Sequence, residues 1–283
     1  MENYQNNHVE QLVLEMQYRN YSARTVNNYR ELLKNLEKKI GIPLNEITGE
    51  HVKKYLNSRI MQEGISVSTI NQCISAYKIL QTDVLKRDWE AIRIKRPRKT
   101  VTLPVILSRS EIESLINATK NVKHKAILML AYSSGLRLQE VQTIKPSAID
   151  SQRMTVHVVQ GKGKKDRYTL LSAKTLDILR IYYKMYRPAV YLFEPQHKKG
   201  HCLSDRTFGH IVKKNGIKAG IKKTISFHTL RHCFATHLME SGVNLKLVQQ
   251  FLGHTSLKTT SIYLHLTETT QGNVVSPLDS MNI

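Results

Sequence analysis

The sequence contains few of the residues that cross-link a chain or hold a structural metal. Its 283 residues include only three cysteines, Cys73, Cys202 and Cys233, and no two of them form a C-x-x-C pair. An odd and scattered set of this kind is neither a disulfide framework nor a thiolate metal site, and it is typical of a reducing compartment. We therefore expect a cytoplasmic protein that needs no metal.

Long apolar runs and acidic side chains are also scarce. No stretch approaches the ~20 apolar residues of a membrane span, and the start, MENYQNNHVEQ, is unlike a signal peptide, so we expect no membrane association. Only 22 Asp and Glu residues accompany 43 Lys and Arg residues, which gives a net charge of +21. Self-repulsion of this size favours a polyanionic partner such as DNA. A ribosomal or merely soluble basic protein is the alternative at this point.

Helical periodicity at the start of the chain predicts a four-helix N-terminal domain over residues 1–92. Apolar residues recur every three or four positions from Val9 to Tyr18 and in three later segments. Hydroxyl side chains suited to helix N-caps precede these later segments: Ser22, Thr48, and Ser66 or Ser68.

A basic segment over residues 93–104 is predicted to link this domain to the next. Pro97 and Pro104 disfavour regular structure there. We expect its cations to contact the DNA backbone, although a solvated hinge is an alternative: Arg93, Lys95, Arg96, Arg98 and Lys99.

Residues 105–268 predict a mostly helical second domain with one small antiparallel sheet. A capping box, S-x-x-E at Ser108, opens its first helix. Strand character appears over 154–159 and 167–171, on either side of a glycine-rich turn. Helices are expected near 123–134, 136–142, 173–186, 205–215, 228–241, 245–252 and 256–265, with Gly216, Gly242 and Gly253 as stops. Residues 269–283 are expected to form a C-terminal tail.

Six side chains scattered through the second domain suit phosphoryl transfer: Arg137, Lys162, His228, Arg231, His254 and Tyr263. Each alone has an ordinary explanation, as a surface cation, a helix cap or a core aromatic. Together they supply two guanidiniums for the phosphate oxygens, a phenol as nucleophile, histidines to assist it and a lysine for the leaving 5′-oxygen. A phosphotyrosine ester conserves the bond energy, so rejoining needs no ATP, and the chain has no Walker-type phosphate loop.

The motifs that carry these residues closely resemble those of the tyrosine recombinase, or phage integrase, family. They are S-G-L-R-L-Q-E-V at 134–141, G-K-G-K-K-D-R at 161–167, H-T-L-R-H-C-F-A-T-H at 228–237, and L-G-H at 252–254 followed by Tyr263. Their order and spacing match across the second domain. The N-terminal helices, with Y-S-A-R-T-V-N-N-Y at 21–29, resemble the core-binding domain of the family.

This resemblance implies a SAM-like core-binding domain, a catalytic domain over 105–268, and site-specific recombination through a 3′-phosphotyrosine intermediate, without cofactor, metal or ATP. It implies that Arg137, Arg231 and His254 bind the scissile phosphate, that Lys162 protonates the 5′-oxygen, and that His228 is the general acid/base. Tyr263 is the implied nucleophile, and Glu140 is expected to orient Arg137. We expect Lys164 and Lys165 to contact DNA.

The resemblance also implies an assembly. Family members act as homotetramers on paired double-stranded DNA sites, so the free chain is expected to be monomeric or weakly associated, with its tail docking on a neighbour. The chain looks most like integron integrases and the recombinases that resolve chromosome dimers. Whether it integrates, excises or resolves a DNA element depends on its DNA sites, and these residues do not determine it.

Three other functions compete with recombination. A topoisomerase of the same nicking chemistry would relax supercoils without exchanging partners. A non-enzymatic, basic DNA-binding regulator explains the charge but not the ordered motifs. A metal nuclease would use His228, His232 and His237, but Arg231 among them would repel a divalent cation.

Overall fold

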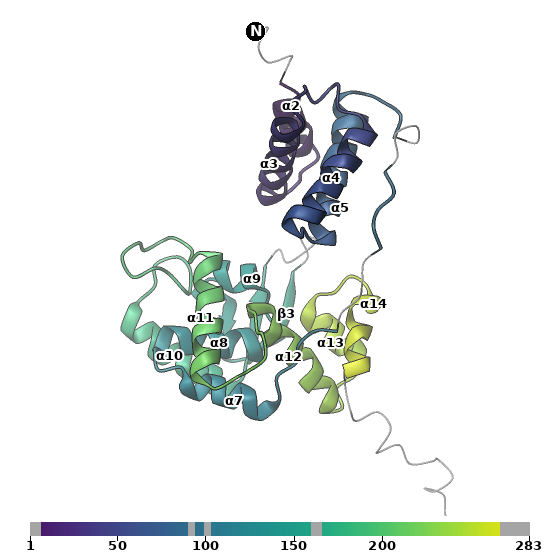
Figure 1. The fold of residues 1–283 in the computed structure, drawn as a ribbon. Coiled ribbons are helices and arrows are strands. Elements are labelled where there is room, and N and C mark those ends of the chain that lie inside the picture. Colours follow the sequence, from purple (N-terminus) through teal and green to yellow (C-terminus); the bar gives the residue numbers. More distant parts are fainter. Residues whose placement is uncertain (1–6, 90–93, 99–102, 160–165, 267–283) are drawn as a thin grey trace, which may run out of the picture. The chain divides into compact units, whose positions relative to one another are not determined.

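The computed structural model describes residues 7–89, 94–98, 103–159 and 166–266, with the side chains of Lys258 and of 264–266 excepted. The chain forms two compact units, Met1–Thr102 and Leu103–Ile283. Helices make up most of both, and the second unit contains a three-stranded antiparallel sheet (Figure 1). The predicted fold class, mainly helical with one small antiparallel sheet, is confirmed.

Four α-helices are found among the described residues of the first unit, and the predicted hydroxyl caps begin three of them. The elements are α2 (His8–Tyr18), α3 (Ala23–Ile40), α4 (Gly49–Glu63), α5 (Val67–Ile79) and a π-helical turn, η1 (Leu80–Val84). Ser22, Thr48 and Ser66 each accept a backbone N–H in the first turn of the following helix, which satisfies a donor that the helix itself leaves free. Apolar faces of all four helices meet in one core.

The first described residues of the expected linker are attached to the first unit. Ile94 is buried in the core of that unit. The guanidinium of Arg96 donates to the main-chain oxygen of Asn71 and to Ser75 Oγ, both at 2.9 Å. Lys95 and Arg98 are exposed, whereas Arg93 and Lys99 lie outside the described residues. The units divide between residues 102 and 103, near the end of the predicted linker.

The second unit is built on a buried helix. Its helices are α7 (Arg109–Ala118), α8 (Val122–Ser133), α9 (Leu138–Thr143), α10 (Ala173–Tyr186), α11 (Asp205–Lys218), α12 (Phe227–Glu240), α13 (Leu245–Leu252) and α14 (Leu257–Thr260), with 3-10 turns η2 (Pro146–Ala148) and η3 (Ser261–Leu266). Most residues of α12 are buried, and the helix packs against both α8 and η3. The predicted capping box is confirmed, because Ser108 N–H donates to Glu111 Oε2 at 2.7 Å and Glu111 N–H to Ser108 Oγ at 3.1 Å.

The prediction that Gly216 ends a helix is wrong. α11 continues through it to Lys218. A Cβ added at Gly216 would lie 2.5 Å from Ile225 Cδ1, so this glycine permits close packing inside the helix and does not terminate it. The helix expected over 256–265 divides into α14 and the 3-10 turn η3.

The sheet has the order β1–β2–β3, with β1 (Ile149–Asp150), β2 (Thr155–Val158) and β3 (Arg167–Leu170). Only β2 and β3 were predicted. Val156 pairs with Thr169, and both are buried on the same face. Thr169 Oγ1 donates to the main-chain oxygen of Ser134 at 2.9 Å, which ties β3 to the chain just before α9. The expected turn at 161–163 lies outside the described residues.

Candidate active site

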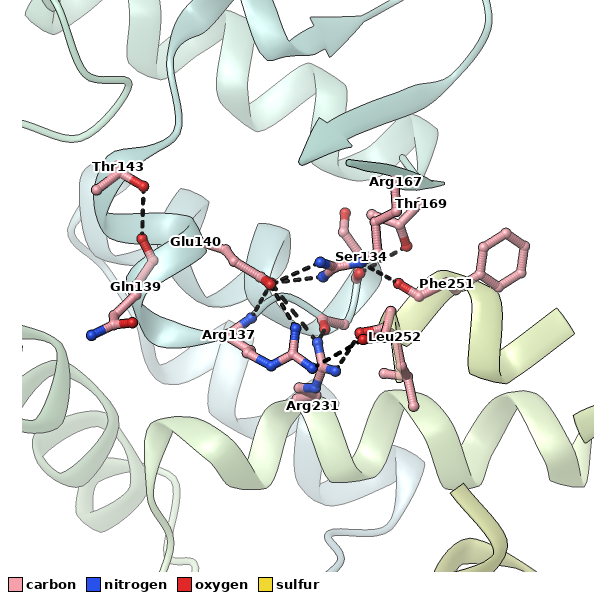
Figure 2. Close-up of polar contacts among 12 residues, drawn as sticks. Ser134, Arg137, Gln139, Glu140, Thr143, Arg167, Thr169, Arg231, Phe251 and Leu252 are labelled. Carbon is pink, nitrogen blue, oxygen red and sulfur yellow. Dashed lines mark hydrogen bonds and ion pairs between the residues drawn. The ribbon is translucent and has the colours of Figure 1, made fainter. Parts of the chain in front are cut away.

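Three arginines gather around one carboxylate in the second unit. The side chain of Glu140, in the first turn of α9, is only 7% exposed. Its Oε1 accepts from Arg137 Nη1 at 2.8 Å, and its Oε2 accepts from the Arg137 backbone N–H at 2.7 Å. Arg167 binds the same carboxylate with both Nη atoms, at 2.8 and 2.7 Å, and Arg231 Nη1 lies 3.8 Å from Oε2 (Figure 2). We call these four residues the guanidinium cluster.

The cluster carries more positive than negative charge. Three guanidiniums and one carboxylate give it a net charge of +2. Burial alone would raise the pKa of Glu140, but Arg167 and its other cationic neighbours hold it at about 2. Burial and then the charge of Arg137 lower the pKa of Arg231 to about 9. Because buried charge is costly unless it is paired, the cluster is a preformed site for an anion.

Arg231 is held by main-chain oxygens on both sides. Its side chain is 1% exposed, and it donates through Nη1 to Gly135 O at 2.6 Å and through Nη2 to Leu252 O at 2.5 Å. Gly135 adopts a left-handed φ of +60°, and a Cβ there would lie 2.2 Å from Phe234 Cδ1. Only glycine therefore permits the turn between α8 and α9 that brings this carbonyl to Arg231.

His254 follows the glycine that ends α13. Its Nδ1 lies 2.9 Å from Oγ1 of the buried Thr260, which fixes the orientation of the ring. Burial and then the charge of Arg231 lower the pKa of His254 to about 3, so the ring is neutral at pH 7. In the first turn of α12, partial burial and then Arg231 and Arg137 lower the pKa of His228.

The phenol of Tyr263 contacts a histidine on α12. Tyr263 is 2% exposed, and its Oη lies 2.9 Å from His232 Nδ1. Burial raises the pKa of Tyr263, whereas the charges of Arg231 and Arg137 act to lower it. Burial and then His228 lower the pKa of His232 to about 4. His232 is therefore neutral at pH 7 and can accept the phenolic hydrogen.

The structure brings most of the predicted site residues into one unit, but not all of them. Arg137, Arg231 and Glu140 meet directly, and His254 follows Leu252 and Gly253, whose carbonyl oxygens face the two arginines. His228 and Tyr263 are joined to the site through His232 on α12. Lys162, Lys164 and Lys165 lie outside the described residues, so their predicted roles stay predictions.

Three residues of the site were not predicted. His232 was considered only as a metal ligand, although its position four residues after His228 was a signal that both rings share a face. Arg167 ends a motif that carries the predicted Lys162, but it was given no role. Thr260 gave no signal, because its contact with His254 depends on how α14 folds back.

An open cleft of about 660 Å³ lies beside the cluster. Arg137, Gln139, Lys145 and His157 are among its lining residues. Across the described part of the chain, no group of three or more His, Cys, Asp or Glu side chains is arranged to hold a metal ion. The described helices include none that is both long and apolar enough to cross a membrane.

Comparison with known proteins finds matches over both units. Residues 106–270 match the phage integrase family, and residues 9–91 match the phage integrase N-terminal SAM-like domain. A putative integrase/recombinase of Sinorhizobium fredii is 36% identical over 89% of this chain and 82% of its own length. A tyrosine recombinase of Thermosipho africanus is 33% identical over 92% of this chain and 95% of its own. The crystal structure of XerH site-specific recombinase bound to its difH substrate shares the fold, with a TM-score of 0.70 and 23% identity over 90% of this chain and 81% of that one.

Proposed function

This chain belongs to the phage integrase family and is a tyrosine recombinase, and we propose that it cuts and rejoins DNA strands through a 3′-phosphotyrosine at Tyr263, without metal or ATP. The observation that carries the proposal is the buried cluster of net charge +2, whose Arg137 and Arg231 act electrostatically on the phenol of Tyr263. A scissile phosphate there would offset the excess charge and lie near the nucleophile.

Each step uses a group of this chain. Arg137 and Arg231 bind the non-bridging oxygens, where negative charge grows in the transition state, and His254 donates to the same phosphate. The phenolic oxygen attacks phosphorus as its proton passes to a neighbouring histidine. The bond from phosphorus to the 5′-oxygen breaks, and that oxygen takes a proton from Lys162. His228, whose ring contacts that of His232, serves as the general acid/base that takes the phenolic proton onward and returns it on rejoining. Attack by a second 5′-hydroxyl, which gives up its proton to Lys162, reverses the sequence on a new partner strand.

The proposed partner is double-stranded DNA that carries paired recombination sites, and the proposed assembly is a homotetramer on these sites. The net charge of +21 favours such a polyanion, and the likeness to a DNA-bound recombinase supports it. Cys73, Cys202 and Cys233 are free thiols, which suits action in the cytoplasm.

A covalent-capture experiment tests this function and identifies the target sequence at the same time. The full-length protein is incubated with nicked duplexes whose inverted arms are randomised, so that cleavage beside the nick releases a short strand and traps the adduct. Adducts that survive denaturation are recovered and sequenced. We expect wild-type protein to enrich one arm sequence and to carry the DNA on Tyr263, with activity unaffected by EDTA.

Tyr263→Phe should abolish the adduct, because phenylalanine has no nucleophilic oxygen. Tyr183→Phe, an exposed tyrosine of α10, is the matched control and should form adducts like wild type. If Tyr263→Phe binds the enriched sequence and still forms adducts, the nucleophile is misassigned. If wild type enriches sequences by binding but forms no adduct, the non-enzymatic regulator is the better description. Relaxation of supercoils without any joining of two marked duplexes would favour the topoisomerase.

A further inference from the structure

Arg167 is the one arginine of the guanidinium cluster that the proposed mechanism does not use. It is the first residue of β3, and its side chain is 8% exposed. Two of its nitrogens bind the two oxygens of Glu140, and Nε donates to Phe251 O at 2.8 Å (Figure 2). Because this side chain is buried and its nitrogens are hydrogen-bonded within the protein, it is not accessible to bind DNA.

The end of α13 explains how the three arginines are held together. Three consecutive main-chain oxygens face them: Phe251 O accepts from Arg167, Leu252 O from Arg231, and Gly253 O lies 3.5 Å from Arg137 Nη2. Carbonyl oxygens at a helix C-terminus carry partial negative charge and favour cations. Arg137 and Arg167 therefore lie between this helix end and Glu140, whereas Arg231 is held between Leu252 O and Gly135 O.

The carboxylate of Glu140 is shared unequally. Arg167 makes a bidentate pair with it, Arg137 reaches it with one Nη atom, and Arg231 remains 3.8 Å away. Bidentate pairing is the strongest arrangement between these two groups. Arg167 thus takes most of the pairing capacity of Glu140 and leaves donors of Arg137 and Arg231 for another anion. Without Arg167, the cluster's net charge would fall from +2 to +1, and Glu140 would pair with the phosphate-binding arginines instead.

We propose that Arg167 is a positioning residue that occupies Glu140 and the end of α13, so that Arg137 and Arg231 stay directed toward the scissile phosphate. This role rests on the proposed function, because the anion it serves is the DNA phosphate. It also predicts a particular dependence on Glu140: removing the charge of Glu140 should compensate for the loss of Arg167.

Single-turnover cleavage of the captured substrate tests the proposal. Arg167→Met should lower the cleavage rate by about 10- to 100-fold, the effect typical of removing a residue that orients a site group, with little change in DNA affinity. Arg167→Lys keeps the positive charge but cannot pair with both carboxylate oxygens at once. Its cleavage rate should therefore lie between those of wild type and Arg167→Met. Adding Glu140→Gln to Arg167→Met restores the net charge of +2 and should raise the rate about 10-fold above that of the single variant.

The matched control is Arg109→Met. Arg109 also bridges two elements, through Nη2 to His237 O at 3.1 Å and to Ser241 Oγ at 2.7 Å, but it has no contact with Glu140. A loss that merely reflects weaker packing would appear in Arg109→Met too, and would deepen when Glu140→Gln is added to Arg167→Met. Wild-type cleavage by Arg167→Met, or a double variant no faster than the single one, would overturn the proposal.

A second measurement keeps the inference separate from the catalytic function. Inorganic phosphate, titrated at constant ionic strength without DNA, should raise the Tm of wild type and of Arg109→Met more than that of Arg167→Met, and the Glu140→Gln double variant should recover the rise. If wild type never forms an adduct but shows this pattern, the recombinase mechanism fails and the role of Arg167 stands. If wild type cleaves but all variants respond alike to phosphate and cleave alike, only the role of Arg167 fails.

Discussion

The phenol of Tyr263 is hydrogen-bonded to His232 of α12. A buried phenol needs a hydrogen-bond acceptor, and neutral His232 provides one at 2.9 Å. Because burial and His228 lower the pKa of His232 to about 4, its ring stays an acceptor throughout the neutral range and loses that capacity only in acid. The phenol therefore keeps a hydrogen-bond acceptor throughout the neutral range.

We expect His232→Phe to lower the single-turnover cleavage rate by about 10²-fold, the effect of removing a positioned proton acceptor. His232→Asn places an acceptor oxygen near the position of the ring Nδ1, so its cleavage rate should fall less than that of His232→Phe. In wild type the rate should fall in acid as His232, whose pKa is about 4, gains a proton, and this fall should move to lower pH in His232→Asn. Cleavage by His232→Phe at the wild-type rate and pH profile would show that another group takes the proton.

At the level of single residues, sequence motifs predicted which groups would carry chemistry but not their contacts. Arg137, Glu140 and Arg231 were predicted together, and the structure brings them together. The pairing of Tyr263 with His232 was not predictable, because it depends on the packing of η3 against α12. Motif spacing records which residue types are required, whereas a contact between distant segments is decided by tertiary packing.

Among the elements, α13 ends at a glycine that packs directly against the guanidinium cluster. Gly253 has a φ of +61°, and a Cβ there would lie 2.7 Å from Arg167 Cδ. Gly64 ends α4 with nearly the same φ, +60°, but nothing lies within 4 Å of its added Cβ. The two glycines therefore share the cost of a left-handed backbone, and only Gly253 adds a collision with the guanidinium cluster.

We expect alanine at either glycine to lower the free energy of unfolding by about 1–2 kcal/mol, the cost of a left-handed conformation for a residue with a Cβ. Only Gly253→Ala should also slow cleavage, by about 10-fold or more, because it displaces Arg167 and the carbonyls that hold the arginines. Denaturant unfolding and single-turnover cleavage measure the two effects. Equal cleavage by both variants would mean that the cluster tolerates a shift at the end of α13.

Sequence patterns predicted most elements but failed where long-range contacts decide the outcome. Ser22, Thr48 and Ser108 cap helices as expected, because capping is local. A stop at Gly216 is the local expectation because glycine often ends helices, yet here it accommodates Ile225. The short strand β1 and the π-turn η1 have no periodicity of their own and form through their neighbours.

For the molecule as a whole, we expect the net charge of +21 to affect the affinity for DNA more than the rate of cleavage. The linker was expected to contribute five cations, but Arg96 already donates to Asn71 and Ser75 of α5. Lys95 and Arg98 are exposed, and they are the two described cations of this segment best placed to meet a phosphate backbone. Each phosphate contact releases condensed counterions, so its loss flattens the dependence of binding on salt.

Lys95→Ala combined with Arg98→Ala should therefore reduce the slope of log K against log salt by about 2, since each phosphate contact contributes roughly 0.9 to the slope. The cleavage rate of the saturated complex should not change, because neither residue belongs to the guanidinium cluster. Lys174→Ala with Lys184→Ala removes the same charge from α10 and is the control for net charge alone. If both pairs flatten the slope equally, the overall field attracts DNA and the linker makes no backbone contact of its own; if neither does, both pairs lie away from the duplex.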